Sequence, residues 1–466
     1  MPADSSPVRS AHPARGRAAP RSALAILGAA LAIGSGVPLA PVAQAALART
    51  LHVATTGTST GDGSAARPFA TVQRGADVAR PGDTILVHQG TYRGVVIITR
   101  SGTQAQPITL TSAGDGPVTL TADFRSPPCD AHAPALDRTI QVLGGADYWT
   151  VSHLNIVNGI TVKGANGSAA MKYLTRLVNT GDWQARRRIP GRGSKDPVAA
   201  ASAFDYLSAK TGVTINPSDG LRFVGNTITR RGIHIIAARY GEVRNNDIGP
   251  VDCGIGPGVW VNVFSDGWTV AGNHIHDIAA STFKHYMQEG IRLGSATSYA
   301  AVRNNLVEHL PGDGRAMNTD VDASWNTFRN NRANDVAMGY NDQMSGWGNV
   351  WDHNVASNFR VWGLNFRGID ASLPQPSLNS STYLAVVTCN TALGGPTDPM
   401  VGGGLHIGAA KSSTFANNTL SSAVLGDPVN GFDYVRQYWG QEGNTWDGQP
   451  TPPPLHPAPP PPGTCG

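Results

Sequence analysis

A short phrase centred on asparagine recurs eight times between residues 219 and 420, and it limits the folds that this chain can adopt. Each copy contains an apolar pair, one or two asparagines and a short alternating strand, and the copies fall at Asn226, Asn246, Asn273, Asn305, Asn331, Asn354, Asn390 and Asn418. The steps between them are 20, 27, 32, 26, 23, 36 and 28 residues. A shortest spacing near 20 residues, with variable numbers of residues added to it, is typical of a solenoid whose coils carry loops of different length.

Asparagine suits such a coil because it tolerates left-handed backbone angles and its amide bonds to neighbouring backbone. Strands of successive coils then pair in parallel, and inward Ile, Val, Leu and Phe side chains stack into one core. A leucine-rich repeat and a β-propeller are competing folds that fit less well, because the L-x-x-L-x-L frame is absent and propeller repeats are more uniform and longer. The repeat therefore predicts an all-β fold, a parallel β-helix.

Composition agrees with many strands and tight turns. Of 466 residues, 55 are glycine and only 15% are charged, and short apolar runs are broken by Gly, Asn and Asp. We expect one large solenoid domain over residues 46–447. A proline-dominated segment, residues 448–466, is predicted to be an extended tail.

The N-terminal segment has the features of a secretory signal peptide. Four arginines precede an apolar run from Ala23 to Val37, and Ala43-Gln44-Ala45 supplies a cleavage signal. The run is too short to span a bilayer, so we expect residues 1–45 to be removed, leaving a secreted, extracellular protein without a membrane anchor. The remaining chain has a net charge of +1, and it shows no nucleic-acid-binding motif or basic face. The sequence thus argues against a nucleic-acid partner.

Four cysteines fit an oxidising compartment, and their spacing is too wide for a zinc site. They are Cys129, Cys253, Cys389 and Cys465. One or two disulfides, with three full pairings, and buried thiols are both compatible with the sequence. Cys465 is placed to fasten the tail.

The segment RPFATVQRGADVARPGDTILVHQGTYRGVVI, residues 67–97, resembles the opening of proteins in the pectate-lyase-like superfamily of secreted bacterial β-helices. The resemblance implies a single-stranded right-handed parallel β-helix, commonly monomeric. Residues 71–79 would form a helix that covers the open end of the solenoid, which otherwise exposes core side chains and strand edges. Residues 164–212 interrupt the repeat, and we expect a loop and helical insertion there that includes the basic loop Arg186–Lys195.

One set of strands places a concentration of polar side chains on its outward face. If the aliphatic residues point inward, alternation puts ten residues outside, and we expect them to line a substrate groove. They are His234, Trp260, Asn262, Arg292, Asn318, Asp320, Asn341, Asn365, Arg367 and His406. A solvated polar face without function is the alternative interpretation.

The loop that enters the fourth of these strands, residues 276–295, adds charged residues at one edge. It brings Lys284, His285 and Glu289 towards Arg292. Asp320, Asp322 and Asp342 follow on neighbouring coils, and converging carboxylates of this kind are the ligands that Ca²⁺ prefers. The sequence equally permits Asp320 and Asp322 to cap turns while Glu289 pairs with Arg292 or Arg315.

In polysaccharide lyases of the resembled superfamily, a uronic-acid carboxylate is neutralised and a base removes the C5 proton. The resemblance implies that Arg292 or Arg367 holds the acid and that Lys284 or His285 is the base. The motifs that place a lysine after an acidic pair in the known lyase branches are absent here, so the carried-over roles rest on analogy.

Two other functions remain compatible with the sequence. A glycoside hydrolase would use two carboxylates as acid and base or nucleophile, with Glu289, Asp320 and Asp322 as candidates. A non-catalytic glycan-binding protein would stack sugars on aromatic side chains such as Trp260, Trp347 and Trp362. In each case the expected partner is a polysaccharide.

Overall fold

The computed structural model describes residues 47–122, 138–192, 202–252, 256–279, 288–343, 346–366, 382–396, 402–407, 410–411, 413–421, 423–425, 445–446, 449–450 and 465. Residues 1–46 form a separate unit outside this part, and the predicted signal peptide and most of the predicted tail therefore lie outside the described residues. None of the helices among the described residues is long and apolar enough to cross a membrane.

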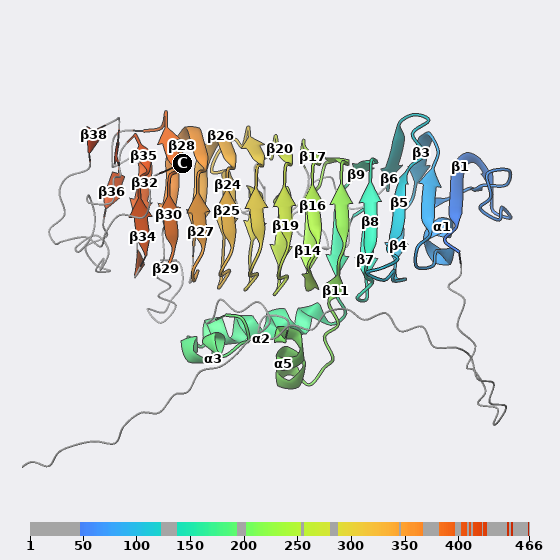
Figure 1. Cartoon of the computed structure of the whole chain (residues 1–466), viewed down its shortest axis with the longest axis horizontal. Helices are drawn as coiled ribbons and strands as arrows, with labels where there is room; N and C mark the ends of the chain where they lie inside the picture. The colour runs from blue at the N-terminus through green and yellow to red at the C-terminus, as the bar shows by residue number, and fades with distance from the viewer. Residues whose placement is uncertain are drawn as a thin grey trace, which may run out of the picture. The chain divides into compact units, whose positions relative to one another are not determined.

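The described residues from 47 onward form a right-handed parallel β-helix in which each coil adds one strand to each of three rows (Figure 1). One row is a twelve-stranded sheet: β1 (Thr50–Thr58), β2 (Thr84–Val87), β5 (Ile108–Ser112), β8 (Trp149–Ser152), β12 (Arg222–Val224), β16 (Glu242–Arg244), β19 (Thr269–Ala271), β22 (Ala301–Arg303), β25 (Thr327–Arg329), β27 (Val350–Asp352), β30 (Val386–Thr388) and β34 (Thr414–Ala416).

The other two rows belong to one larger sheet, because β26 and β28 run through both of them. The first row contains β3 (Gly90–Arg93), β6 (Val118–Thr121), β9 (Asn155–Val157), β13 (Thr227–Thr229), β17 (Asp247–Ile248), β20 (His274–His276), β23 (Leu306–Glu308), β26 (Arg332–Asp342), β28 (Val355–Phe366), β31 (Thr391–Leu393), β35 (Thr419–Leu420) and β37 (Thr445–Trp446), and β38 (Gln449–Pro450) pairs antiparallel with the last of these.

The second row, which carries the predicted groove, contains β4 (Val96–Ile98), β7 (Ile140–Leu143), β10 (Ile160–Lys163), β14 (Ile233–Ile236), β18 (Val259–Asn262), β21 (Glu289–Leu293), β24 (Arg315–Thr319), the C-terminal parts of β26 and β28, β32 (Gly403–Ile407) and β36 (Ala423–Leu425). Two short pairs complete the strands: β11 (Ser218–Asp219) with β15 (Ala238–Arg239), and β29 (Thr382–Tyr383) with β33 (Ala410–Lys411).

The recurring asparagines form a ladder along the inside of one corner. The backbone N–H of Asn273 donates to Asn305 Oδ1 at 3.0 Å, and its side-chain amide donates to the same oxygen at 2.9 Å and to the Val243 carbonyl at 2.9 Å. The same bonds repeat from Asn226 to Asn418. The ladder thus satisfies buried backbone donors at every turn of the coil.

The expected reason for asparagine at these positions is wrong in one respect. The left-handed residue of each turn is the one directly before the ladder asparagine, for example Asn245, Asn304 and Asn330, with φ values of 54°, 56° and 54°. His353 and Cys389 take that place in later coils, with φ values of 54° and 57°. The ladder asparagine itself is required for its buried amide, not for its backbone angle.

The predicted end cap is confirmed as α1 (Val72–Val78). Thr71 caps it, because its hydroxyl accepts a hydrogen bond from the Arg74 N–H at 3.2 Å. Val72 and Ala76 are buried in the same continuous core that runs up to Leu420. The cap therefore covers apolar side chains of the first coils, as the solenoid end requires.

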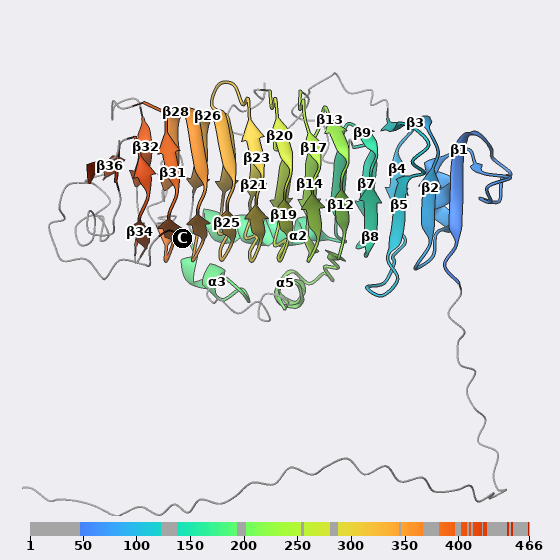
Figure 2. The same cartoon turned by 45° about the horizontal axis from the view of Figure 1, so that its top comes forward.

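The described residues of the predicted insertion form the helices α2 (Gly167–Asn179), α3 (Trp183–Arg187) and α5 (Ala203–Thr211), which lie along one flank of the coils (Figures 1 and 2). Their apolar faces pack against the ends of second-row strands, where Ala237, Val263, Phe264 and Ala296 are buried with them. The insertion thus has a small core of its own that joins it to the solenoid.

The basic loop of the insertion is partly internal. Arg186 pairs with Asp322 through Nε–Oδ2 at 2.7 Å, and Arg192 pairs with Asp266 at 2.9 Å. Both arginines are at most 1% exposed. These two side chains therefore fasten the insertion to the coils and do not form an exposed basic surface, because a buried guanidinium needs a carboxylate partner.

Cys465 is bonded to Cys389, which joins the end of the chain to the turn before the ladder residue Asn390. This bond is one of those that the cysteine count allowed, and it fastens the tail as expected. Cys129 and Cys253 lie outside the described residues.

Candidate functional site

The predicted polar file runs in register across the second row of strands. Each member lies beside the next on the adjacent coil, in the order His234, Trp260, Arg292, Asn318, Asn341, Asn365 and His406. Asn262 and Asp320 stand two residues further along their strands, on the same face. Stacked coils have thus brought residues separated by 172 positions onto one wall (Figure 2), where the strands from β14 to β32 follow one another.

Much of this file is covered, which corrects the expectation of an open groove along its length. Asn262, Asn318, Asn341 and Asn365 are at most 3% exposed. In the part of the file nearest the N-terminus, two aromatic rings and a guanidinium group are stacked. The centres of the His234 and Trp260 rings are 4.2 Å apart, and the Arg292 guanidinium carbon lies 5.2 Å from the centre of the Trp260 ring.

Burial, together with the nearby charges of Arg138 and Arg292, lowers the pKa of His234 to about 3. His234 is therefore a neutral stacking residue.

A second outward file lies three residues before the first, and the sequence analysis did not place its members together. Glu289, Arg315, Met338 and Trp362 are register partners on β21, β24, β26 and β28. Alternation fails between the two files because each strand begins with a corner. A Cβ added at Gly290 or Gly363 there would lie 2.4 Å from a neighbouring side chain. The small residue that directly follows a member of this file, such as Gly290 or Gly363, was the available signal.

The two files meet in a charged cluster around Glu289, which is completely buried. Arg292 donates to its two oxygens at 3.1 and 2.9 Å, and Arg315 Nη1 lies 3.6 Å from Oε1. Arg292 also binds Asp320. Burial acts to lower the pKa of Arg292, but the charges of Glu289 and Asp320 raise it overall, so this guanidinium stays charged.

A chain of hydrogen bonds leads from this carboxylate along five successive coils. Asn318 Nδ2 donates to Glu289 Oε1 at 2.8 Å, and Asn341 Nδ2 donates to Asn318 Oδ1 at 2.5 Å. Asn365 Nδ2 then donates to Asn341 Oδ1 at 2.6 Å, and His406 Nδ1 lies 2.7 Å from Asn365 Oδ1. We call these four bonds the amide relay.

The relay fixes the tautomer of His406. Glu289, which faces two arginines, is an acceptor, so Asn318 must turn its amide nitrogen towards it and its oxygen towards Asn341. Asn341 and Asn365 must each turn their amide nitrogen towards the preceding oxygen in the same way. The atom that Asn365 presents to His406 Nδ1 is therefore its side-chain oxygen. Nδ1 must therefore carry the proton, and the lone pair of the neutral imidazole is on Nε2. The result is a positioned proton acceptor.

His406 and Arg315 line the same cavity of about 210 Å³. Met338, Asn341, Gln343, Trp362 and Asn365 complete its lining. The Trp362 and His406 rings stack at 4.8 Å with 19° between their planes, which fixes the orientation of the imidazole. The cavity thus combines a cation, a proton acceptor, amide groups and an aromatic face, and none of the described residues that line it is acidic.

The three predicted calcium ligands do not converge. Asp320 binds Arg292, Asp322 binds Arg186 of the insertion, and Asp342 accepts a hydrogen bond from the Thr319 hydroxyl at 3.0 Å. Each carboxylate is directed to a different set of partners, so the expected arrangement of these three residues is wrong. The presence of Ca²⁺ elsewhere in the protein is a separate question, and that prediction remains untested.

Lys284, His285 and Arg367, predicted as bases or as acid-binding groups, lie outside the described residues. Their roles stay predictions. Of the predicted substrate-binding residues, Asn341, Asn365 and His406 reach the cavity. His234, Asn262 and Asn318 are buried away from it.

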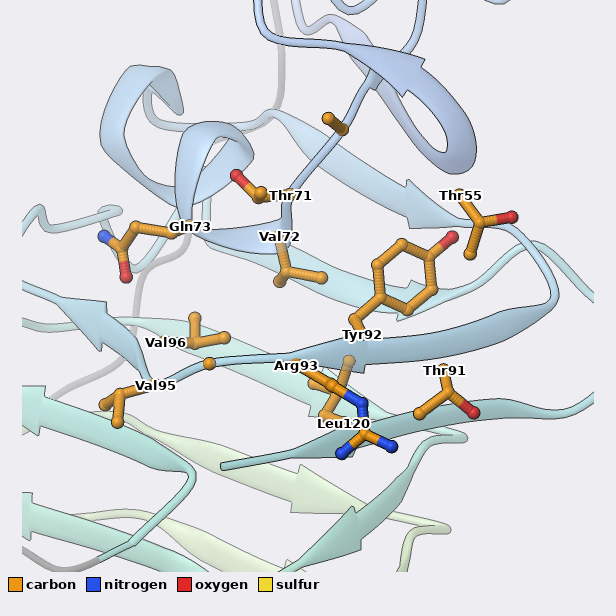
Figure 3. Close-up of a pocket in the computed structure, with 12 residues that line it drawn as sticks. Thr55, Thr71, Val72, Gln73, Thr91, Tyr92, Arg93, Val95, Val96 and Leu120 are labelled. Atoms are coloured by element: carbon orange, nitrogen blue, oxygen red, sulfur yellow. The ribbon is translucent and has the colours of Figure 1, made fainter. Parts of the chain in front are cut away.

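A second hollow, of about 410 Å³, lies beside the end cap. Figure 3 shows the Tyr92 ring between Val72 and Thr55, with Arg93 on the neighbouring position of β3. The Tyr92 hydroxyl donates to the His88 carbonyl at 2.8 Å. Arg93 is the only charged residue among the described lining residues, so this hollow lacks the acid–base pair that chemistry would need.

No protein-family model and no curated protein matches the chain. Among solved structures, a rhamnogalacturonan lyase matches at 13% identity, with 79% of this chain and 87% of the other covered and a TM-score of 0.49. Pectate lyase Pel9A matches at 14% identity, with 79% of each chain covered and a TM-score of 0.45. A lacto-N-biosidase from Eubacterium ramulus matches at 12% identity, with 85% of this chain and 62% of the other covered and a TM-score of 0.43.

The chain has a parallel β-helix fold, as its strand pairings show. The resemblance expected from residues 67–97 is therefore confirmed for the fold. At these identities the likeness extends no further, because one scaffold of this kind carries unrelated chemistries. The activity of this β-helix has to be argued from its own cavity.

Proposed function

We propose that this protein is a secreted lyase that cleaves a uronic-acid-containing polysaccharide by β-elimination. The observation that carries the proposal is the cavity that Arg315 and the relay-bound His406 line together, with no acidic residue among the described residues of its lining. Elimination needs one cation and one base, whereas glycoside hydrolysis needs two carboxylates at the scissile bond. The described lining therefore favours elimination over hydrolysis.

In the proposed reaction, Arg315 binds the carboxylate of the uronic acid and withdraws charge from it, which acidifies the C5 proton. His406 Nε2 takes that proton, and the electron pair of the C5–H bond forms the C4–C5 double bond. The C4–O bond breaks, and the imidazolium returns the proton to the leaving oxygen. Asn365 holds Nδ1 and stabilises the imidazolium through the relay to Glu289.

The aromatic face and the amides have a binding role in this proposal. Trp362 offers a flat surface of the kind on which sugar rings stack, and Gln343 and Asn341 offer donors and acceptors for hydroxyl groups. Lys284, His285 and Arg367 remain candidates for further contacts with the acid or the leaving group, and the predicted signal peptide accounts for secretion.

The test is to incubate the purified protein with pectate, alginate, glucuronan and glycosaminoglycans. Elimination produces an unsaturated sugar that absorbs in the near ultraviolet, and we expect this signal for at least one substrate. His406→Ala and Arg315→Gln should each abolish it, since a positioned base alone contributes about 10²–10⁴-fold.

A matched control is His153→Asn, because His153 is exposed at a left-handed turn that asparagine accepts. It should keep full activity. Reducing ends without ultraviolet absorbance would assign the protein to the hydrolases, and glycan binding without any product would assign it to the binding proteins. Undiminished elimination by His406→Ala would remove the histidine from its role.

A further inference from the structure

A cluster of two histidines and three carboxylates lies on the outer face of the first row, away from the cavity described above. Asp247 on β17 is the register partner of His274 on the adjacent strand β20 (Figure 1). His276 stands two residues beyond His274 on the same face, and Glu308 on β23 is the register partner of His276. Asp277 follows directly in the chain.

Three atoms of this cluster converge. His274 Nδ1 lies 3.2 Å and His276 Nε2 lies 3.3 Å from the same oxygen, Asp247 Oδ1. A tetrahedral zinc ion with bonds near 2.0–2.1 Å has neighbouring ligands about 3.3 Å apart. These two separations are close to the edges of a zinc tetrahedron and long for hydrogen bonds from a charged imidazole, and all three atoms lie within 4.8 Å of one another.

The far nitrogen of each ring is held by a different carboxylate. His274 Nε2 lies 3.0 Å from Glu308 Oε1, and His276 Nδ1 lies 2.7 Å from Asp277 Oδ2. In a neutral imidazole these nitrogens carry the proton, so the unprotonated nitrogen of each ring is the one that lies near Asp247 Oδ1. The two rings stack at 4.5 Å, and an unprotonated nitrogen beside a carboxylate oxygen is unfavourable unless a cation lies between them or the ring is protonated.

We propose that Asp247, His274 and His276 bind a divalent transition-metal ion of the zinc type. The arrangement has the imidazole lone pairs inward and a carboxylate on each outer nitrogen, as histidine ligands of metals commonly have. Three protein ligands leave one position of the tetrahedron for water or a ligand. The Asp247 and His274 side chains are 50% and 43% exposed, so solvent reaches that position.

The site does not depend on the proposed lyase activity, because its residues face away from the second row. It also differs from the predicted calcium site in its ligands, since nitrogen donors favour zinc and related metals over calcium. The metal joins two adjacent coils, and we expect it to stabilise the protein by mass action, since it binds only the folded arrangement.

The experiment is a calorimetric titration of ZnCl₂ into the purified full-length chain without a histidine tag. We expect one zinc ion per chain and a higher melting temperature with zinc. His276→Asn and Asp247→Asn should each weaken binding by more than about 100-fold. Asp277→Asn, which keeps the hydrogen-bond acceptor but loses the charge, should weaken it by about 10–100-fold.

The matched control is His309→Asn. Its Nδ1 lies 3.9 Å from Asp277, outside the three converging atoms, and its φ of 56° suits asparagine. It should bind zinc like the wild type. Absence of zinc binding by the wild type would instead assign the cluster to protonated ion pairs, and equal binding by wild type and His276→Asn would place any zinc elsewhere; either result overturns the proposal.

Discussion

Replacing Asp342 by asparagine should stabilise this protein at neutral pH. Asp342 lies on β26 and is completely buried, and its oxygens accept hydrogen bonds from three neutral partners: the Thr319 hydroxyl, the Asn349 amide at 3.2 Å and the Trp351 indole at 3.3 Å. Burial raises the pKa of the carboxyl to about 6, against the lowering effect of these bonds. An asparagine can keep its oxygen towards Asn349 and Trp351 and donate its amide to Thr319.

The magnitude follows from the difference between the folded and unfolded pKa values. A shift from 3.8 to about 6 means that ionised Asp342 disfavours the folded state by about 3 kcal/mol above pH 6. Between pH 4 and 6 the folded state binds more protons than the unfolded state. Protonation of Asp342 therefore removes its destabilising effect on the folded wild-type protein as the pH falls. We therefore expect Asp342→Asn to raise the free energy of unfolding by about 1–3 kcal/mol near pH 8 and by almost nothing near pH 4.

Urea unfolding of wild type and variant at several pH values measures this difference, and subtraction removes the titration of all other groups. Asp266→Asn is the contrasting variant. Burial raises the pKa of Asp266 to about 6 as well, but its partner is the buried Arg192. Its replacement leaves that charge without a counterion and should cost about 3–5 kcal/mol at neutral pH. A destabilised Asp342→Asn near pH 8, or a gain that does not change with pH, would refute the reasoning.

Three further variants test the ladder and the relay. Asn305→Ala removes the acceptor of two buried donors of Asn273, and it should lower the free energy of unfolding by about 3 kcal/mol in urea titrations, whereas Asn304→Gly, at the left-handed position next to it, should change it by less than about 1 kcal/mol. Asn318→Leu breaks the relay at a residue that does not itself line the cavity, although it also removes the acceptor of the Gln343 amide, and it should lower kcat of the proposed elimination by at least about tenfold and shift its pH profile; an unaltered pH profile in a folded variant contradicts the role of the relay.

The sequence was informative wherever a rule of period and spacing holds. The asparagine repeat predicted the coils, and alternation placed His234 through His406 on one face in the correct register. The same alternation missed Arg315, Met338 and Trp362, because a corner between the rows puts residues three apart on one face.

Side-chain pairs between distant parts of the chain could not be predicted from the sequence for a different reason. Arg186 and Asp322 are 136 residues apart, and the order of donors in the relay depends on which coil lies next to which. The sequence alone placed polar residues in one file, but it did not show which partner of each hydrogen bond donates and which accepts. The order of donors and acceptors makes His406 a proton acceptor, and it ends at the negative charge of Glu289.

The asparagine ladder has a consequence for how such a protein changes size. Every rung makes the same bonds to the rung before and the rung after, from Asn226 to Asn418. If a coil were gained by duplication or lost by deletion, the asparagines on either side would find the same hydrogen-bonding partners as before. No other change at the boundary would then be needed to keep the ladder continuous. The number of coils, and with it the length of surface offered to a long polymer, can therefore vary in evolution in single units while the interior stays the same.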